Sequence, residues 1–440
     1  MSADPGPPAD EVFHQTRYLD VALRALDEIF ASAAPDERQA QRYQSVRRTL
    51  VRFAVDRGPE PGRDELGVTW PHPPAAQLSD PELAAAAADE AALLDAAIGR
   101  ADARLAAPVG SSGAATNAAL DAPTIEKALR RAGFPDAQVR AAQLVFGGRS
   151  KETVLLEADA TGLPRELVLR RDLAMSSLGT TVTDEYPLLQ LLHHAGVRVP
   201  EPYLLVDDPE LLGAPFLLLE RRTGTAGGGI LGTTSTPARL RATARALASV
   251  HGVPAEDARA AMGGGAGSNG DGLRRELDGL YGEWRRLNRG DSLTVEAAFR
   301  WLRAHVPDDA GRQVLVHADF SFHNLLFDGA ELTAILDWEL AHVGDPAEDF
   351  CYLRSTAEAT VGWPAFLADY RDAGGGDVPL PSVRFFELRA TVRLIVQLLR
   401  SRDHFEHGRI DDPIKADGSM YWLPRVAQRL AREVAEALAG

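Results

Sequence analysis

The stretch that decides the fold is HADFSFHN, residues 317–324, followed by ILDWE, residues 335–339. Short apolar runs flank both stretches: VLV precedes the first, LLF follows it, and AIL leads into Asp337. Apolar runs of this length, bounded by polar residues, are typical of short buried strands. The polar residues of both stretches are therefore expected in loops between buried strands.

This spacing of polar residues fits phosphoryl transfer, which requires few protein groups. One carboxylate must orient the acceptor hydroxyl and accept its proton, while two or three oxygen ligands hold Mg²⁺ against the phosphates. Asp319 is the candidate catalytic base, and Asn324 and Asp337 are the candidate metal ligands. His317 is interpreted as a structural residue that forms hydrogen bonds within the loop. The alternative is a polar loop without chemistry, which the presence of all four residues at this spacing disfavours.

The segments on either side of this core differ in their periodicity. Upstream, QLVFGG, TVLLEAD, RELVLRR and residues 203–207 and 215–220 predict five strands, with a helix from Thr183 to Ala195 among them. Shorter helices are expected at 124–132 and 136–142. Downstream, helices are expected at 237–251, 271–288, 294–305, 363–372, 383–403 and 419–439, with a glycine-rich, flexible insertion at 260–272. We therefore predict an α+β fold of two lobes, an antiparallel sheet followed by a mostly helical lobe, which is the shape of a kinase.

The same residues carry a resemblance to a known family. VHADFSFHNLLF resembles the H-G-D-x-x-x-x-N pattern of the aminoglycoside phosphotransferase family, a branch of the protein-kinase-like fold. AILDWELAHVGDPAEDF is similar to the longer signature of the subgroup found as kinase domains fused to, or encoded near, acyl-CoA dehydrogenases. The resemblance covers about residues 142–403. Ala318 stands where the family usually has glycine, and this departure matters only if the backbone there requires a positive φ.

The resemblance also identifies a loop on the nucleotide side. FGGRSKET, residues 146–153, resembles the loop that covers the nucleotide phosphates, where backbone N–H groups approach the phosphates. Gly147, Gly148 and Ser150 are accordingly assigned to nucleotide binding. Taken alone, two glycines between strands indicate only a turn.

Two charged residues are assigned to the nucleotide side by the same resemblance. Arg170, in LVLRR, takes the place of the kinase lysine and is expected to contact the α- and β-phosphates. Lys151 is the poorer candidate for this role, because it is expected to lie in the loop itself. Glu185 matches the family's E-Y pair on the next helix and is expected to form an ion pair with Arg170. His251, at the end of ALASVH, is expected to be satisfied within a helix–helix contact.

The N-terminal part of the chain has no motif of this kind. Residues 1–106 are interpreted as a helical region of unknown role and 107–121 as a linker. The kinase-like lobes are then expected at 122–225 and 226–440. The N-terminal helices either pack on the next domain or form a homodimer.

Charge and cysteine content exclude several classes of function. The chain has 47 Lys and Arg against 63 Asp and Glu, a net charge of −16, which disfavours nucleic acid and anionic membrane surfaces as partners. Its single cysteine, Cys351, cannot form an internal disulfide. The N-terminus lacks the features of a signal peptide, and no run of about eighteen apolar residues predicts a membrane helix. We therefore expect a cytoplasmic protein.

The sequence thus predicts an ATP-dependent, Mg²⁺-requiring kinase that phosphorylates the hydroxyl of a small molecule. Two acceptors stay open: a hydroxyacyl-CoA-like metabolite, which the longer signature favours, and an aminoglycoside, which an acidic surface could attract. Several arginines between 389 and 402 either bind CoA phosphates or are ordinary solvated charges. A catalytically silent nucleotide-binding module is a third hypothesis, and the presence of Asp319, Asn324 and Asp337 disfavours it. A protein kinase is disfavoured because DWE replaces D-F-G and no A-P-E segment follows. ATP and GTP are not distinguished.

Overall fold

The computed structural model describes residues 120–145, 151–172, 180–228, 234–264, 270–287, 292–307, 313–407 and 422–439, together with Ser79, Pro81 and Ala85. Apart from Pro81, Ala85 and residues 120–121, the predicted N-terminal helices and the linker fall outside this description, and so does the homodimer proposed through these helices. The chain divides into two compact units. One contains Asn117–Leu273 and Pro307–Glu387, and the other contains Met1–Thr116, Arg274–Val306 and Leu388–Gly440. The domain boundaries expected from the sequence stay predictions.

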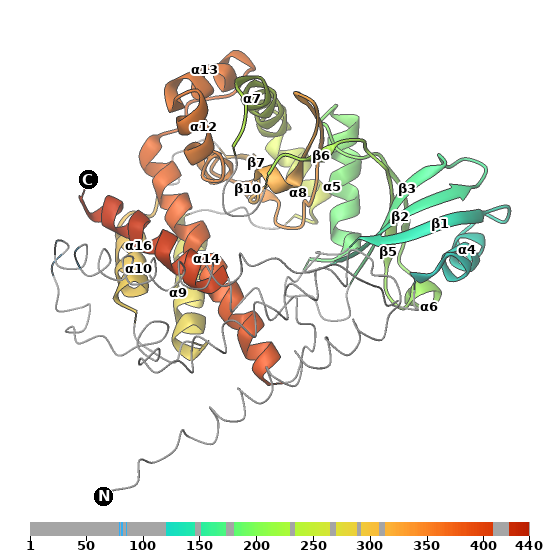
Figure 1. The fold of residues 1–440 in the computed structure, drawn as a ribbon, viewed down its shortest axis with the longest axis horizontal. Helices are drawn as coiled ribbons and strands as arrows, with labels where there is room; N and C mark the ends of the chain where they lie inside the picture. The colour runs from blue at the N-terminus through green and yellow to red at the C-terminus, as the bar shows by residue number, and fades with distance from the viewer. Residues whose placement is uncertain are drawn as a thin grey trace, which may run out of the picture. The chain divides into compact units, whose positions relative to one another are not determined.

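The first unit begins with a five-stranded antiparallel sheet in the order β1-β2-β3-β5-β4 (Figure 1). Its strands are β1 (Gln138–Val145), β2 (Lys151–Asp159), β3 (Glu166–Asp172), β4 (Pro202–Val206) and β5 (Phe216–Glu220). The five predicted strands are confirmed. The helix predicted at 136–142 is wrong, because residues 138–142 belong to β1 and pair with Asp159–Leu156 of β2, and strand pairing overrides local helix propensity.

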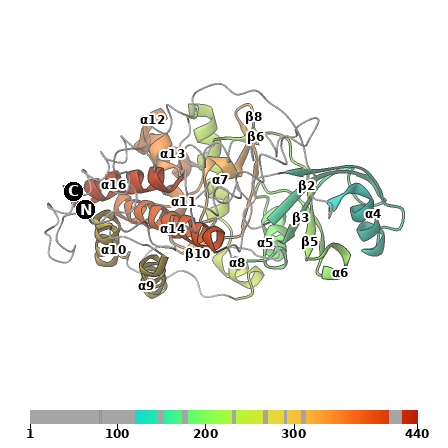
Figure 2. The same cartoon turned by 60° about the horizontal axis from the view of Figure 1, so that its bottom comes forward.

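Alternation along the strands gives the sheet two different faces. Val154, Leu156, Leu167 and Leu169 are buried on one face in a core shared with α4 (Ala122–Arg131) and α6 (Pro209–Leu212). The alternate side chains point the other way. Arg170 is among these and reaches α5 (Val182–His194), which lies on the other side of the sheet in Figures 1 and 2.

The start of α5 is fixed by its own sequence. The Thr181 side chain accepts a hydrogen bond from the Asp184 N–H, while the Asp184 carboxylate accepts one from the Thr181 N–H at 2.8 Å, which forms a capping box. Asp172, at the end of β3, also accepts from the Val182 N–H at 3.0 Å. These caps place Glu185 in the first turn of the helix.

The rest of the first unit is helical and carries short strands. The helices are α7 (Pro237–His251), α8 (Ala255–Ala261), α11 (Ala347–Phe350), α12 (Arg354–Thr360) and α13 (Trp363–Asp372). The strands β6 (Thr225–Ala226), β8 (Leu325–Asp328) and β9 (Glu331–Ile335) form one small sheet, and β7 (Val314–Val316) pairs with β10 (His342–Gly344). The α7 helix lies beside these short strands (Figure 2). The predicted helices at 237–251 and 363–372 are confirmed, whereas α8, α11 and α12 were not predicted.

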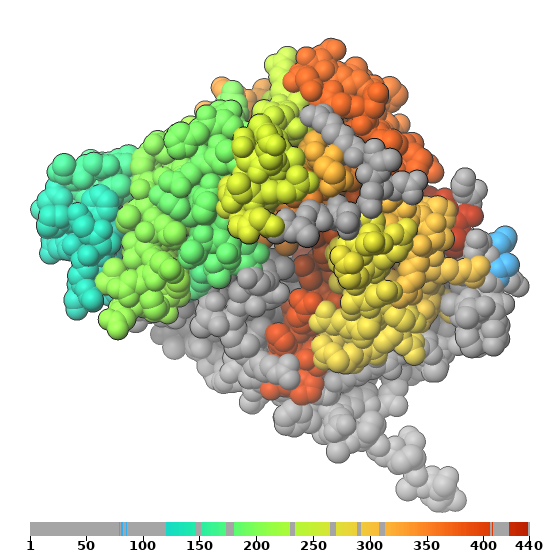
Figure 3. All heavy atoms as spheres, turned by 180° about the vertical axis from the view of Figure 1, so that it is seen from behind, coloured from blue at the N-terminus to red at the C-terminus, as the bar shows by residue number. Residues whose placement is uncertain are grey.

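The described part of the second unit consists of helices. They are α10 (Leu293–Ala304), α16 (Leu423–Ala439) and parts of α9 (Gly270–Leu287) and α14 (Leu380–Glu406). Figure 3 shows the atoms of α9 and α10 side by side in yellow and gold, and the Tyr281 ring packs edge-on against Phe299 at 5.1 Å. Within the described residues, no helix has the length and apolar character to cross a bilayer.

The arginines of α14 have protein partners. Arg389 is 4% exposed and its NH2 group lies 2.6 Å from Glu276, while Arg400 pairs with Glu283 at 2.5 Å. These two arginines are therefore ion-paired with α9 rather than ordinary solvated charges. Since their guanidinium groups are already paired, they give no support to the interpretation of a site for CoA phosphates.

Candidate active site

The buried carboxylate of Asp349 holds the start of the HADFSFHN loop. Asp349 accepts hydrogen bonds from the backbone N–H groups of His317 at 2.9 Å and Ala318 at 2.8 Å. His251 donates from Nε2 to the same carboxylate at 3.1 Å, and its Nδ1 lies 2.8 Å from the Tyr370 hydroxyl. His251 thus has partners on two other segments, as the sequence predicts. This buried network fixes the start of the loop.

Ala318 has an unusual backbone conformation in this loop. Its φ is 63°, in the left-handed region that L-residues other than glycine rarely adopt. Its methyl group is fully buried, and its carbonyl accepts a hydrogen bond from the Tyr352 hydroxyl at 2.9 Å. The backbone here does require a positive φ, so alanine in place of glycine carries strain that the surrounding hydrogen bonds offset.

Ala318→Val is expected to lower the free energy of unfolding by about 2 kcal/mol or more, because a β-branched residue is poorly compatible with positive φ and overpacks a closed core. Ala318→Gly should change it by less than about 1 kcal/mol, since relief of strain is offset by greater backbone entropy of the unfolded chain. Urea unfolding of both variants measures these differences. Equal stability of the valine variant and the wild type would contradict this account of the loop.

The predicted base and the predicted amide ligand are in direct contact. Asn324 Nδ2 donates to the Asp319 carboxylate at 2.9 Å and to the Asp319 carbonyl at 3.0 Å. The amide nitrogen is therefore directed at Asp319, so the amide oxygen is the atom of Asn324 that could meet the predicted metal. His323 Nε2 lies 3.5 Å from the same carboxylate, and Ser321 Oγ lies 2.7 Å from His323 Nδ1. No role for His323 or Ser321 was expected from the sequence.

Asp337 is tied to this loop through its neighbour. The Leu336 N–H donates to the Asn324 carbonyl at 2.8 Å, and the Leu336 carbonyl accepts from His317 Nε2 at 2.8 Å. His317 Nδ1 also accepts from the Asp319 N–H at 3.3 Å, which is the hydrogen bond within the loop that the sequence predicts. Asp337 follows with φ 67°, a conformation that Asp tolerates better than most residues, and its side chain is 37% exposed. Hydrogen bonds thus link Asp319 to Asn324 and Asn324 to Leu336, the residue that precedes Asp337.

The side-chain oxygens of Asn324 and Asp337 can be compared with the ligands that Mg²⁺ prefers in proteins. Within the described residues, no group of three or more His, Cys, Asp or Glu side chains is placed to hold a metal. Mg²⁺ does not need such a cage, because it keeps several waters and is bound through one or two carboxylates together with substrate phosphates. An amide oxygen from Asn324 and a carboxylate from Asp337 fit this requirement.

The Arg170–Glu185 ion pair predicted from the sequence is present. Arg170 NH1 donates to Glu185 at 2.9 Å, and NH2 donates to Asp337 at 2.8 Å. Burial lowers the pKa of Arg170, but the carboxylates of Glu185 and Asp337 outweigh burial and hold the pKa above its ordinary value. The guanidinium therefore stays charged and joins the sheet to the candidate metal site. Gly147, Gly148 and Ser150 fall outside the described residues, and their assignment stays a prediction.

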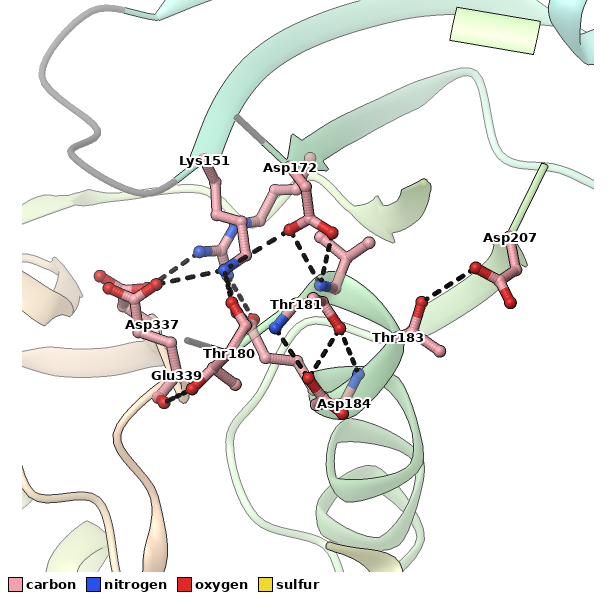
Figure 4. A network of polar contacts seen from close by, with 12 residues as sticks. Lys151, Asp172, Thr180, Thr181, Thr183, Asp184, Asp207, Asp337 and Glu339 are labelled. Atoms are coloured by element: carbon pink, nitrogen blue, oxygen red, sulfur yellow. Dashed lines mark hydrogen bonds and ion pairs between the residues drawn. The ribbon is translucent and has the colours of Figure 1, made fainter. Parts of the chain in front are cut away.

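Lys151 is the site residue that the sequence analysis placed wrongly. It is the first residue of β2, not part of the loop, and its side chain is 2% exposed. Its Nζ lies 2.8 Å from the Thr180 carbonyl and 3.3, 3.3 and 3.6 Å from Glu339, Glu185 and Asp172 (Figure 4). The alternation of side chains along β2 could have placed Lys151 correctly. Val154 and Leu156 face the core, so Lys151 and Thr153 face the other side of the sheet, where Arg170 lies.

The fold and the site together define a kinase-like phosphotransferase domain. Residues 141–386 match the model of the phosphotransferase enzyme family, so the chain belongs to that family. Acyl-CoA dehydrogenase family member 10 of Mus musculus is 30% identical over 227 residues, which are 50% of this chain and 21% of that protein. The chain therefore spans about a fifth of the length of this relative. The predicted subgroup is confirmed.

Solved structures share the fold. A candidate aminoglycoside phosphotransferase from Ralstonia eutropha JMP134 superposes with a TM-score of 0.55 at 20% identity, over 72% of this chain and 98% of that one. An aminoglycoside phosphotransferase in a ternary complex with ADP and hygromycin B has a TM-score of 0.50 at 18% identity, over 72% of this chain and 99% of that one. At these identities the likeness shows the α+β fold, with its antiparallel N-terminal sheet and mostly helical second lobe.

Proposed function

We propose that the protein is an ATP-dependent, Mg²⁺-requiring kinase that phosphorylates a hydroxyl group of a small molecule. The observation that carries this proposal is the hydrogen-bonded set of Asp319, Asn324 and the Leu336–Asp337 segment, with Arg170 bonded to both Asp337 and Glu185. The ADP held by the structural relative supports a nucleotide as the phosphoryl donor.

In the proposed reaction the acceptor oxygen attacks the γ-phosphorus and the bond to the β-phosphate oxygen of ADP breaks. Asp319 orients the acceptor hydroxyl and takes its proton, and Asn324 keeps the carboxylate in place through its amide nitrogen. Asn324 and Asp337 hold Mg²⁺, which supplies positive charge at the phosphate oxygens. Arg170 adds a permanently charged guanidinium on the side of the α- and β-phosphates.

A hydroxyacyl-CoA-like metabolite is the acceptor class that the relatives favour. The mouse relative bears the name of an acyl-CoA dehydrogenase, and a kinase domain joined to such an enzyme is expected to act on a related acyl thioester. The aminoglycoside alternative rests on a structural relative that binds hygromycin B at 18% identity. A silent nucleotide-binding module is disfavoured, because Asp319, Asn324 and Asp337 are all present, Asn324 is hydrogen-bonded to Asp319, and the Leu336 N–H next to Asp337 is bonded to the Asn324 carbonyl.

The acceptor is tested by following ADP release with Mg²⁺-ATP and, separately, Mg²⁺-GTP against three panels. These are hydroxyacyl-CoAs of several chain lengths, the matching free hydroxy acids, and aminoglycosides. We expect Mg²⁺-dependent ADP release with the hydroxyacyl-CoAs, phosphorylated product by mass spectrometry, and no turnover after chelation of Mg²⁺. Turnover of aminoglycosides alone would replace the proposed acceptor. Binding of Mg²⁺-ATP without transfer to any panel would favour the silent module.

A further inference from the structure

We propose that Lys151 is a buried positioning residue that sets the geometry of the nucleotide site without touching the nucleotide. Of the two cations Lys151 and Arg170, only Arg170 contacts the nucleotide. This inference rests on the proposed kinase function and assigns a role to a buried charge that the reaction itself does not use. Three observations support it: the partners of Lys151, the contact of Glu185 with both Lys151 and Arg170, and the position of Glu339 two residues after Asp337.

Lys151 donates hydrogen bonds to the Thr180 carbonyl and to Glu339, and it forms ion pairs with Glu185 and Asp172. A lysine ammonium has three N–H donors and no acceptor. The Thr180 carbonyl lies 2.8 Å from Nζ, and carboxylate oxygens of Glu339 and Glu185 each lie 3.3 Å away, with Asp172 at 3.6 Å. With a side chain only 2% exposed and several acceptors around it, Lys151 is poorly placed to meet a phosphate.

Arg170 differs from Lys151 in this respect. A guanidinium has five N–H donors. Among the described residues, the hydrogen bonds of Arg170 go to Glu185 and to Asp337, one from each terminal nitrogen. Its side chain is 14% exposed. Arg170 therefore keeps donors for phosphate oxygens that the buried ammonium of Lys151 does not.

Glu185 is divided between the two cations. Its Oε2 accepts from Arg170 at 2.9 Å, and its Oε1 lies 3.3 Å from Lys151 Nζ. The Glu185 side chain is completely buried, so its negative charge depends on the two nearby cations for compensation. Lys151 thus fixes the rotation of the carboxylate that orients Arg170, and the β2–β3 register places both cations on the same face of the sheet.

Glu339 connects Lys151 to the candidate metal ligand. Glu339 follows Asp337 by two residues. Its side chain is 9% exposed, and its carboxylate lies 3.3 Å from Lys151 Nζ (Figure 4). The Thr180 hydroxyl donates to the Glu339 carbonyl at 2.8 Å, while the Thr180 carbonyl accepts from Lys151. Lys151, Thr180 and Glu339 therefore form a closed set of contacts that joins β2 and the start of α5 to the segment after Asp337.

The test compares Lys151→Met, Lys151→Arg, Glu339→Gln and the Lys151→Met/Glu339→Gln double variant with the wild type. Lys127→Met is the matched control, because Lys127 is exposed on α4 and loses the same charge. The measurements are the Kd of Mg²⁺-ATP by calorimetry and the KM of Mg²⁺-ATP and of the acceptor. Each single neutralising change is expected to raise the Kd of Mg²⁺-ATP by about 10–100-fold, as for outer-shell partners of metal ligands, with the KM of the acceptor unchanged.

The double variant distinguishes positioning from direct contact. If Lys151 acts through Glu339, the double variant should bind Mg²⁺-ATP about as weakly as either single variant, and Lys151→Arg should recover part of the loss. A Glu339→Gln variant with wild-type affinity would overturn the positioning role, even if Lys151→Met fails to fold. Wild-type affinity in Lys151→Met would do the same. No Mg²⁺-nucleotide binding by the wild type would instead overturn the kinase function, and the Lys151 role with it.

Discussion

Asp319→Asn is expected to lower kcat by about 10²–10⁴-fold, the usual contribution of a positioned general base. The change keeps the size of the side chain and an oxygen that can accept from Asn324 Nδ2, which now lies 2.9 Å away. The affinity for Mg²⁺-ATP should therefore stay close to that of the wild type, and the loss should fall on the transfer step. Steady-state ADP release and calorimetric Mg²⁺-ATP binding measure the two effects separately.

The control for this variant is Asp328→Asn, an exposed aspartate at the end of β8 that makes the same change of charge outside the site. It should retain wild-type kcat. Full activity in Asp319→Asn would remove Asp319 from the role of base. A loss of nucleotide binding as large as the loss of kcat would instead assign Asp319 to the metal site.

Asp337→Asn is expected to abolish measurable stabilisation by Mg²⁺-ATP. Asparagine is chosen because Asp337 has φ 67°, a left-handed conformation that Asn also tolerates, whereas alanine would add backbone strain to the loss of the ligand. A ligand present at 100 times its Kd stabilises a protein by about 2.7 kcal/mol, so loss of the site should be visible as a missing rise in Tm. The measurement is the Tm of both proteins with Mg²⁺-ATP and with ATP after chelation.

Asp337→Asn affects Arg170 as well as the proposed metal site. Asp337 accepts from Arg170 NH2 at 2.8 Å, so its replacement weakens both the metal site and one of the two anchors of the guanidinium. Glu185 should still hold Arg170 through NH1 at 2.9 Å. A Mg²⁺-dependent rise in Tm for Asp337→Asn equal to that of the wild type would exclude Asp337 as a metal ligand.

Sequence reasoning succeeded where the signal is local. The apolar pattern of RELVLRR predicts β3 and that of residues 183–195 predicts α5, and the family resemblance then paired Arg170 of the strand with Glu185 of the helix. The six residues from Asp319 to Asn324 also form a local loop, in which the two side chains meet directly. These features depend on few residues and on short separations in the chain.

The errors come from contacts between distant segments. Residues 138–142, the first part of the edge strand β1, were predicted as a helix because their structure depends on pairing with β2, which the local composition does not reveal. The position of Lys151 was missed because its partners lie 29 residues away at Thr180 and 188 residues away at Glu339.

The sequence by itself determined the class of fold and the residues that the proposed chemistry requires, because phosphoryl transfer needs a base, an amide and a carboxylate at a recognisable spacing. Only the tertiary structure decided how these residues are held. The left-handed backbone at Ala318 is stabilised by Asp349 and Tyr352, neither of which is adjacent in sequence. The buried ammonium of Lys151 is stabilised by carboxylates from three other segments. A strained backbone or a buried charge is stable only where distant groups meet it, and folding brings those groups together.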